Sequence, residues 1–219
     1  MRFTRARVVP VAVSLATALL LGLVGPVAGK WDNPACVAVG IVFSSGWPWA
    51  CYAFLMGCFR PSRIESMLLA SVGLAIGVVT YYVFKDMYPT IPAGVESAAP
   101  VPAGMESGAS SGGKILVWGT AAFVFGAPLG LVGNLARTPG IGGLLFRLLV
   151  PLVAFVEATQ RLHVEAESQG PVFTTTWNVT RVAACVVAVA LMGHTVRSRR
   201  DRRGRQHGRT EAAAPAQRL

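Results

Sequence analysis

Six long apolar stretches, separated by short polar or basic segments, run through this chain of 219 residues. Each is close to the ~20 residues that an α-helix needs to cross the ~30 Å hydrocarbon core of a bilayer. The pattern therefore predicts an all-α fold, a polytopic transmembrane helical bundle of about six spans that forms one domain over residues 1–196. The predicted spans are residues 8–28, 35–59, 64–84, 115–135, 141–160 and 176–196.

The first stretch also fits a secretory signal peptide. Arg2, Arg5 and Arg7 precede it, and Val27-Ala28-Gly29 is an acceptable cleavage site. However, the apolar run from Val8 to Gly29 is longer than the ~7–15 residues of a signal h-region, and further spans follow it. We therefore expect an uncleaved anchor; cleavage would remove one helix and leave the remaining topology unchanged.

The second stretch contains Ser44-Ser45-Gly46-Trp47-Pro48-Trp49. Because proline lacks an N–H and clashes with the preceding helical turn, we expect a kink or break near residues 44–46. The serine hydroxyls would then bond to the freed backbone groups. Two interpretations stay open. A broken helix at membrane depth can form a substrate site, or residues 35–45 are a short interfacial or re-entrant piece before a helix that begins at Pro48, with the tryptophans marking the interface.

Basic residues are concentrated in every second segment between the apolar stretches. Segments 1–7, 60–63, 136–140 and 197–219 hold 14 of the 20 Lys and Arg residues. The alternate segments, 29–34, 85–114 and about 161–175, hold four: Lys30, Lys85, Lys114 and Arg161. Lys and Arg are retained on the cytoplasmic side of a membrane. The pattern therefore predicts that both termini face the cytoplasm and that the protein is a multi-pass protein of the inner (plasma) membrane.

Composition excludes an ordinary soluble domain, because 53% of the residues are apolar and only 14% are charged. The net charge of +10 would suggest nucleic-acid binding in a soluble protein, but here the basic residues lie at the ends of apolar segments. The excess of Arg over Lys is typical of a GC-rich bacterial genome. Composition thus indicates where the protein is located and leaves its reaction or substrate open.

Two polar segments are predicted to lack regular structure. Residues 85–114 are rich in Pro, Ala, Gly and Ser and form the expected flexible outer loop. Residues 197–219 form a basic cytoplasmic tail that we expect to be disordered, and whose arginines would attract anionic lipid headgroups. Nucleic acid is a less favoured partner of the tail, because no aromatic residues for base stacking lie between its arginines. The predicted lipid contacts are Arg197, Arg199, Arg200, Arg202, Arg203 and Arg205.

Three charged residues fall inside predicted spans, where charge is costly and marks a candidate functional site. Glu157 and Arg181 lie at similar depth near the outer ends of their spans, and Arg147 lies in the inner half of the fifth. A functional interpretation is a polar site, lined also by Trp47 and Trp49, in which an arginine binds an anion and Glu157 balances charge. A structural interpretation is a Glu157–Arg181 ion pair and an Arg147 that extends to the headgroups.

Small residues are spaced for close helix packing. Gly73 and Gly77 in the third span, and Gly126 and Gly130 in the fourth, have the four-residue spacing that lets helix backbones approach. The four cysteines lie in apolar stretches, and the histidines are isolated. We therefore predict no metal site, no cofactor and no catalytic residue.

The run Ser44-Ser45-Gly46-Trp47-Pro48-Trp49, followed by Ala53-Phe54-Leu55, Gly57, a basic residue and a span ending in Tyr81-Tyr82, carries a family resemblance. Over residues 40–84 the chain resembles a family of uncharacterised small multi-pass integral membrane proteins of GC-rich bacteria. The resemblance implies a multi-pass protein of unassigned function. It supplies no catalytic or binding residues.

Three functions are compatible with these patterns. The first is a non-enzymatic membrane protein, either permease-like or an accessory subunit with membrane-protein partners or further copies of itself. The second is an enzyme of lipid or envelope chemistry at the membrane face, although no loop carries a cluster of catalytic residue types. The third is a membrane-anchored interaction protein that uses its arginine-rich tail.

Overall fold

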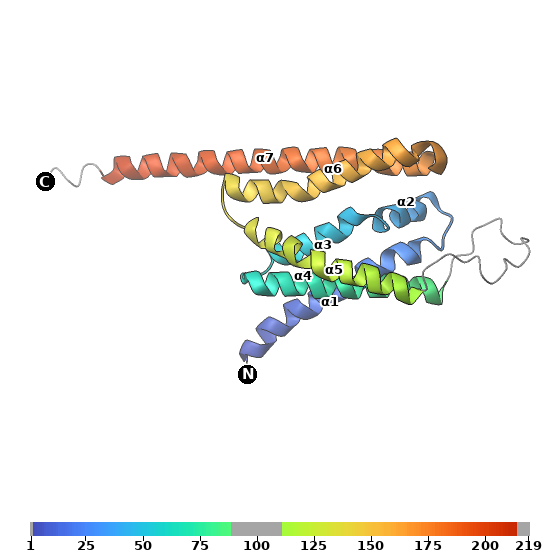
Figure 1. Ribbon diagram of the computed structural model, residues 1–219. Coiled ribbons are helices and arrows are strands. Elements are labelled where there is room, and N and C mark those ends of the chain that lie inside the picture. Colours follow the sequence, from blue (N-terminus) through green and yellow to red (C-terminus); the bar gives the residue numbers. More distant parts are fainter. Residues whose placement is uncertain (1, 89–110, 214–219) are drawn as a thin grey trace, which may run out of the picture.

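The computed structural model describes residues 2–88 and 111–213, and the side chains of 11–88, 112–166 and 169–198. This part of the chain is helical and contains no strand, which confirms the predicted all-α fold (Figure 1). The helices are α1 (Arg2–Ala28), α2 (Pro34–Phe43), α3 (Gly46–Cys58), α4 (Arg63–Met87), α5 (Ser111–Leu135), α6 (Ile141–Gln169) and α7 (Pro171–Ala213).

Five of these helices are long and apolar enough to cross a membrane: α1, α4, α5, α6 and α7. The pair α2 and α3 gives a sixth crossing if the two helices are counted as one broken span. Figure 1 shows successive passes running in alternate directions, with α2 and α3 in series from one end of the bundle to the other. By length and composition the chain is thus a multi-pass membrane protein. The side that each end faces stays a prediction.

The tightest packing joins α3, α4 and α5 through four glycines, which we call the glycine seam: Gly57, Gly126, Gly130 and Gly133. A Cβ added at Gly126 would lie 2.5 Å from Ser71 Cα, and one at Gly130 would lie 2.5 Å from Ser66 O. Such separations are shorter than van der Waals contact, so the backbones meet only because glycine has no side chain. The predicted packing glycines Gly126 and Gly130 therefore belong to this seam.

The other predicted packing glycines, Gly73 and Gly77, lie on α4 at its contacts with α3 and α1. A Cβ at Gly73 would collide with the Tyr52 hydroxyl, and one at Gly77 would lie 3.0 Å from Ala18 O. Tyr52 is buried and donates a hydrogen bond to Ser14 O at 3.0 Å, which ties α3 to α1. A core cluster of Ala18, Tyr52, Ala53, Ala70 and Leu74 fills this region.

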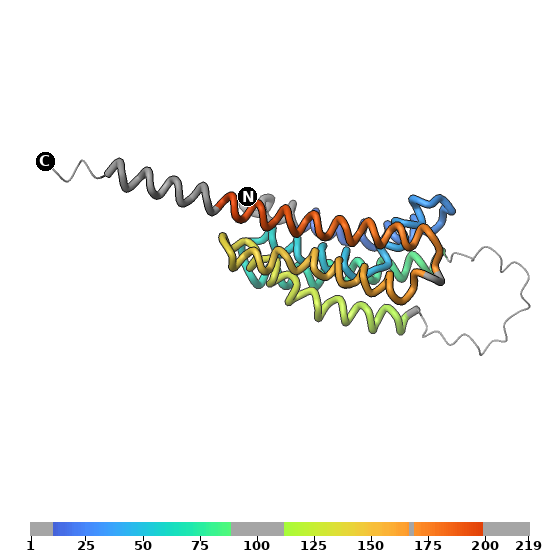
Figure 2. Tube along the Cα trace, turned by 90° about the horizontal axis from the view of Figure 1, so that it is seen from above, coloured from blue at the N-terminus to red at the C-terminus, as the bar shows by residue number. Residues whose placement is uncertain are grey.

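Helices α6 and α7 lie side by side in both views (Figures 1 and 2) and extend further than the hydropathy pattern predicts. α6 continues from the expected end at 160 to Gln169. Gly170, at φ 81°, makes the turn, and Pro171 opens α7. Glycine adopts positive φ at little cost, and proline is favoured in the first helical turn. The expected outer segment 161–175 is therefore mostly helix.

The tail also differs from the prediction, because α7 continues as helix to Ala213. A span that is already helical needs no new nucleation to extend, and Arg, Gln and Ala are good helix formers. Arg197 is exposed. The side chains of Arg199, Arg200, Arg202, Arg203 and Arg205 lie outside the described residues, as do residues 89–110 of the predicted outer loop. The expected lipid contacts of the tail stay a prediction.

Candidate functional site

The break between α2 and α3 lies where the sequence predicts it. α2 ends at Phe43, Ser45 has an extended backbone (φ −91°, ψ 166°), and the two helix axes differ by 63°. Pro48 then falls in the first turn of α3, where its missing N–H removes no hydrogen bond within the helix. The predicted break at residues 44–46 is confirmed. Figure 1 shows α2 and α3 in series from one end of the bundle to the other. The pair is either one broken span or a re-entrant loop.

Side chains satisfy the carbonyl groups that the break frees at the end of α2. Two serine hydroxyls and one indole N–H donate to three successive carbonyl oxygens, as we expected for the hydroxyls. The bonds run from Ser44 Oγ to Ile41 O (2.9 Å), from Ser45 Oγ to Val42 O (2.6 Å) and from Trp49 Nε1 to Phe43 O (3.2 Å). The break is therefore a defined structure with its own hydrogen bonds.

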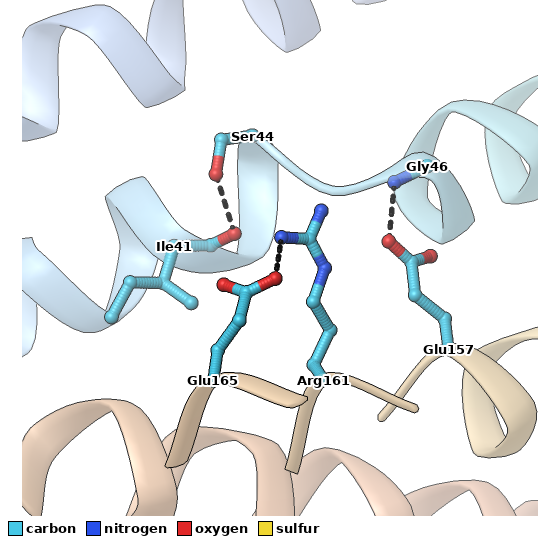
Figure 3. Close-up of polar contacts among 6 residues, drawn as sticks. All are labelled: Ile41, Ser44, Gly46, Glu157, Arg161 and Glu165. Atoms are coloured by element: carbon cyan, nitrogen blue, oxygen red, sulfur yellow. Dashed lines mark hydrogen bonds and ion pairs between the residues drawn. The ribbon is translucent and has the colours of Figure 1, made fainter. Parts of the chain in front are cut away.

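Glu157 of α6 caps the first turn of α3 (Figure 3). The Gly46 N–H donates to Glu157 Oε1 at 3.0 Å, and the Trp47 N–H donates to Oε2 at 2.9 Å. Helix N-termini carry unsatisfied N–H groups and partial positive charge, which a carboxylate compensates. Ser45, the residue that would usually supply the cap, makes no side-chain cap bond because its hydroxyl donates to Val42. The cap is instead supplied by a distant helix.

Glu157 is the first member of a row of charged side chains on α6. Glu157, Arg161 and Glu165, here called the charged row, are spaced by four residues and so project from one side of the helix. Arg161 Nη1 donates to Glu165 Oε1 at 2.7 Å. Figure 3 shows the Arg161 guanidinium between the two carboxylates, reaching toward the segment that joins Ser44 to Gly46. The row thus places three charges beside the helix break.

The expected ion pair between Glu157 and Arg181 is absent from the described residues. Both carboxylate oxygens of Glu157 already accept backbone N–H groups, so it has little to gain from a second partner. Arg181 instead donates to Asn178 Oδ1 at 3.0 Å, one turn back on α7. That pair prediction is wrong because it considered side-chain partners only, whereas the partner of Glu157 is the backbone.

Arg147 lies at the opposite end of α6 from the charged row, near the loop that joins α5 to α6. Its Nε donates to Ala136 O at 2.8 Å, just beyond the end of α5. A cation bonded to a carbonyl at a helix C-terminus is favoured by the helix dipole. Asn134 and Arg137 both donate to Arg60 O nearby, which joins this loop to the α3–α4 loop. These contacts assign Arg147 a capping role outside the break.

The two tryptophans of the predicted polar site, Trp47 and Trp49, lie beside the break and contact different neighbours. Trp47 packs against the buried cluster of Ala158, Phe173 and Trp177 on α6 and α7. Trp49 makes an edge-to-face contact with Tyr81 of α4, with ring centroids 6.2 Å apart. Of the five predicted site residues, the structure thus brings together Trp47, Trp49 and Glu157.

A cavity of about 450 Å³, here called the break cavity, opens beside Trp49. Its wall combines side chains of α3, α4 and α5 with the break itself and one residue of α6. Most of these side chains are apolar or aromatic, and Arg161 is the charged one. The lining residues are Phe43, Ser44, Ser45, Gly46, Trp49, Ala50, Leu74, Val78, Tyr81, Tyr82, Trp118, Ala121, Ala122, Phe125, Leu129 and Arg161.

Sequence reasoning missed Arg161 because the apolar pattern ends near residue 160, which placed Arg161 in a loop. The available signal was the spacing of Glu157, Arg161 and Glu165, which predicts one charged helix face once the helix is allowed to continue. Chemically, the site offers an apolar aromatic cavity, one guanidinium and a carboxylate that caps a half-helix.

Comparisons with protein-family models, curated proteins and solved structures found no match for this chain, so the family resemblance stays a prediction.

Proposed function

We propose that the protein is a permease-like membrane protein in which the break cavity holds the transported molecule. The observation that carries this proposal is the Glu157 cap, because it joins the broken span to a different helix at the wall of a cavity. In many transporters, substrate sites are formed by discontinuous helices whose half-helix ends line the site. Here the α3 end of the break has the same arrangement.

In this proposal the cap also supplies the moving part. α3 is held to α6 through two hydrogen bonds from its first turn, at Gly46 and Trp47. Loss of the carboxylate charge, or competition from another anion, would weaken these bonds and free the N-terminal end of α3. The break cavity, whose wall includes Gly46, would change shape as a result. This coupling of cap and cavity is what a permease needs to alternate between two states.

A strain that lacks the gene, complemented with variants, tests this proposal. Glu157→Gln keeps the size of the side chain and removes its charge. The matched control is Glu65→Gln, which changes an exposed glutamate in the first turn of α4, away from the break. We expect Glu157→Gln to be present in the membrane in normal amounts but to fail to restore the growth or cell-surface phenotype of the strain. We expect Glu65→Gln to be present in normal amounts and to restore the phenotype. Full complementation by Glu157→Gln would overturn the proposal.

The same strain separates the alternative functions. Truncation before residue 199 removes the basic end of the chain and leaves the break intact. Loss of complementation by this truncation, together with full activity of Glu157→Gln, would favour a membrane-anchored interaction protein. Loss of complementation by Glu157→Gln, together with full complementation by the truncated protein, would favour the permease-like function. Reporter fusions within residues 89–110 and at the C-terminus test the proposed orientation, with the C-terminus expected in the cytoplasm.

A further inference from the structure

The break cavity has the size and wall of a site for a small amphipathic molecule. Its volume of about 450 Å³ falls in the ~300–1,000 Å³ range of small-molecule sites. Phe43, Trp49, Tyr81, Trp118 and Phe125 supply a largely aromatic wall, against which an apolar chain can pack. Among the described helices, α5 packs closely on α4 but makes only limited contact with α6. The cavity thus lies beside the sparse contact between α5 and α6.

Arg161 is the charged residue in this wall, and much of its hydrogen-bonding capacity is unused. Its Nη1 donates to Glu165, which leaves Nε and Nη2 without a protein acceptor among the described residues. A guanidinium binds carboxylate and phosphate groups through paired N–H donors. In Figure 3 the guanidinium reaches toward the segment between Ser44 and Gly46, whose residues also line the cavity.

We propose that the break cavity binds an amphiphile with one apolar chain and an anionic carboxylate or phosphate head. The head binds the guanidinium of Arg161, in place of or beside Glu165, and the chain packs among Trp49, Tyr81 and Trp118. Aromatic walls also attract cations, but Arg161 repels a cationic head at this position. The inference rests on the proposed function and names its substrate class.

A series of ligands with the same chain and different heads tests the proposal. The full-length protein is placed in nanodiscs of zwitterionic lipid, so that the bilayer supplies no anionic lipid. Bromine-labelled dodecanoate, dodecyl phosphate, dodecanol and dodecyltrimethylammonium are tested as quenchers of the protein's tryptophan fluorescence, to which Trp49 and Trp118 of the cavity wall contribute. Unlabelled ligand is added as competitor to separate saturable binding from partition into lipid. Acetate and inorganic phosphate, which lack the chain, are tested as competitors.

We expect saturable binding of dodecanoate and dodecyl phosphate, and about tenfold weaker binding of dodecanol, which lacks the charge that strengthens a hydrogen bond to the guanidinium. We expect no binding of the cation, which Arg161 repels. Acetate and inorganic phosphate should not compete, because the chain supplies much of the affinity. Equal quenching by all four heads without competition, or tighter binding of the cation, would overturn the proposal. Full competition by inorganic phosphate alone would also overturn it, because the site would then bind free anions.

Two variants of the charged row should change the affinity for dodecanoate in opposite directions. Arg161→Gln should reduce the affinity for dodecanoate about tenfold, to that for dodecanol, whereas Glu165→Gln should increase it by removing a competitor for the guanidinium. The matched control is Arg181→Gln, which changes an arginine bonded to Asn178 on α7. Unchanged binding by Arg161→Gln would contradict the proposal.

A variant of the apolar wall keeps the test valid if Arg161→Gln fails to fold. Ala121→Leu adds volume at the cavity wall and leaves every charge in place, so it should weaken all chain-bearing ligands together. Unchanged binding by this variant would place the ligand elsewhere and overturn the proposal.

Failure of this binding proposal is distinct from failure of the proposed function. If no amphiphile binds but Glu157→Gln still abolishes complementation, the permease-like function stands with a different substrate.

Discussion

The glycine seam and the α3–α6 contact both join helices of this bundle, but they do so in opposite ways. At the seam, glycines of α3 and α5 let backbones meet, so that a single added methyl group would collide with Ser66 O or Ser71 Cα. At the break, the Glu157 carboxylate of α6 accepts two backbone N–H groups of α3, and Trp47 packs against the cluster that contains Ala158, with a cavity beside them. The first contact depends on shape and the second on hydrogen bonds.

This difference separates the parts that can rearrange from those that cannot. Contacts between closely packed backbones have no alternative partner, so the seam has one geometry. A charged cap can exchange its partner for another anion, or lose its charge, without disturbing the packing of other helices. We therefore infer that the seam supplies the rigid frame and that the break supplies the adjustable site. The predictions below test this division.

The largest effect is expected at the seam. Gly130→Ala places a methyl group 2.5 Å from Ser66 O and 2.8 Å from the Ala70 side chain. Overpacking of this kind costs about 1–3 kcal/mol, and the cost should reach the upper part of that range because one neighbour is backbone. Reversible unfolding in mixed micelles measures it. Gly119→Ala on the same helix is the control, since nothing lies within 4 Å of its added Cβ. Equal stability of the two variants would contradict a rigid seam.

A smaller loss is expected at the cap. Glu157→Ala removes the acceptor of two N–H groups at the start of α3, and loss of a helix N-cap costs about 0.5–2 kcal/mol. Hydrogen exchange should speed up at Gly46 and Trp47 and remain slow within the seam. The matched control is Glu65→Ala in the first turn of α4. Uniform loss of protection across the bundle would show that the break is not a separate unit.

Much of this division could be predicted from the sequence. Hydropathy located the apolar helices, because each must present an apolar surface over the whole bilayer thickness. Pro48 and the two serines located the break, because proline cannot continue a helix and hydroxyls bond to freed carbonyls. Gly126 and Gly130 indicated close approach through their spacing alone. These features depend on local chemistry, which the sequence displays directly.

The composition of the site could not be predicted in the same way. The partner of Glu157 is the backbone of residues 46 and 47. Every residue except proline has a backbone N–H, so the residue types do not reveal which N–H groups bind the carboxylate. Arg161 was assigned to a loop because the helix continues past the end of its apolar run. Arg147 and Arg181 are charges within apolar stretches, but their acceptors lie at Ala136 and Asn178, which only the folded chain identifies.

The two serines at the break should differ in their effects. Ser45 is buried and donates to Val42 O at 2.6 Å, so Ser45→Ala should cost about 1 kcal/mol by leaving that carbonyl without its hydroxyl donor. Ser44 makes an equivalent bond to Ile41 O but is exposed, and Ser44→Ala should cost less. Unfolding measurements of the two variants compare them directly. A larger loss at Ser44 would show that exposure does not set the strength of these bonds.

A similarly small effect is expected from Trp49→Phe, which tests whether the end of α2 is held by the hydrogen bond or by the aromatic ring. The variant removes the indole N–H that donates to Phe43 O at 3.2 Å and keeps an aromatic ring beside Tyr81. A bond of this length between neutral groups contributes about 0.5–1 kcal/mol. Trp118→Phe is the control, because Trp118 lines the same cavity and its indole has no acceptor among the described residues. If both variants lose the same stability, the ring rather than the N–H holds this side of the break, and the adjustable part of the site is confined to the Glu157 cap.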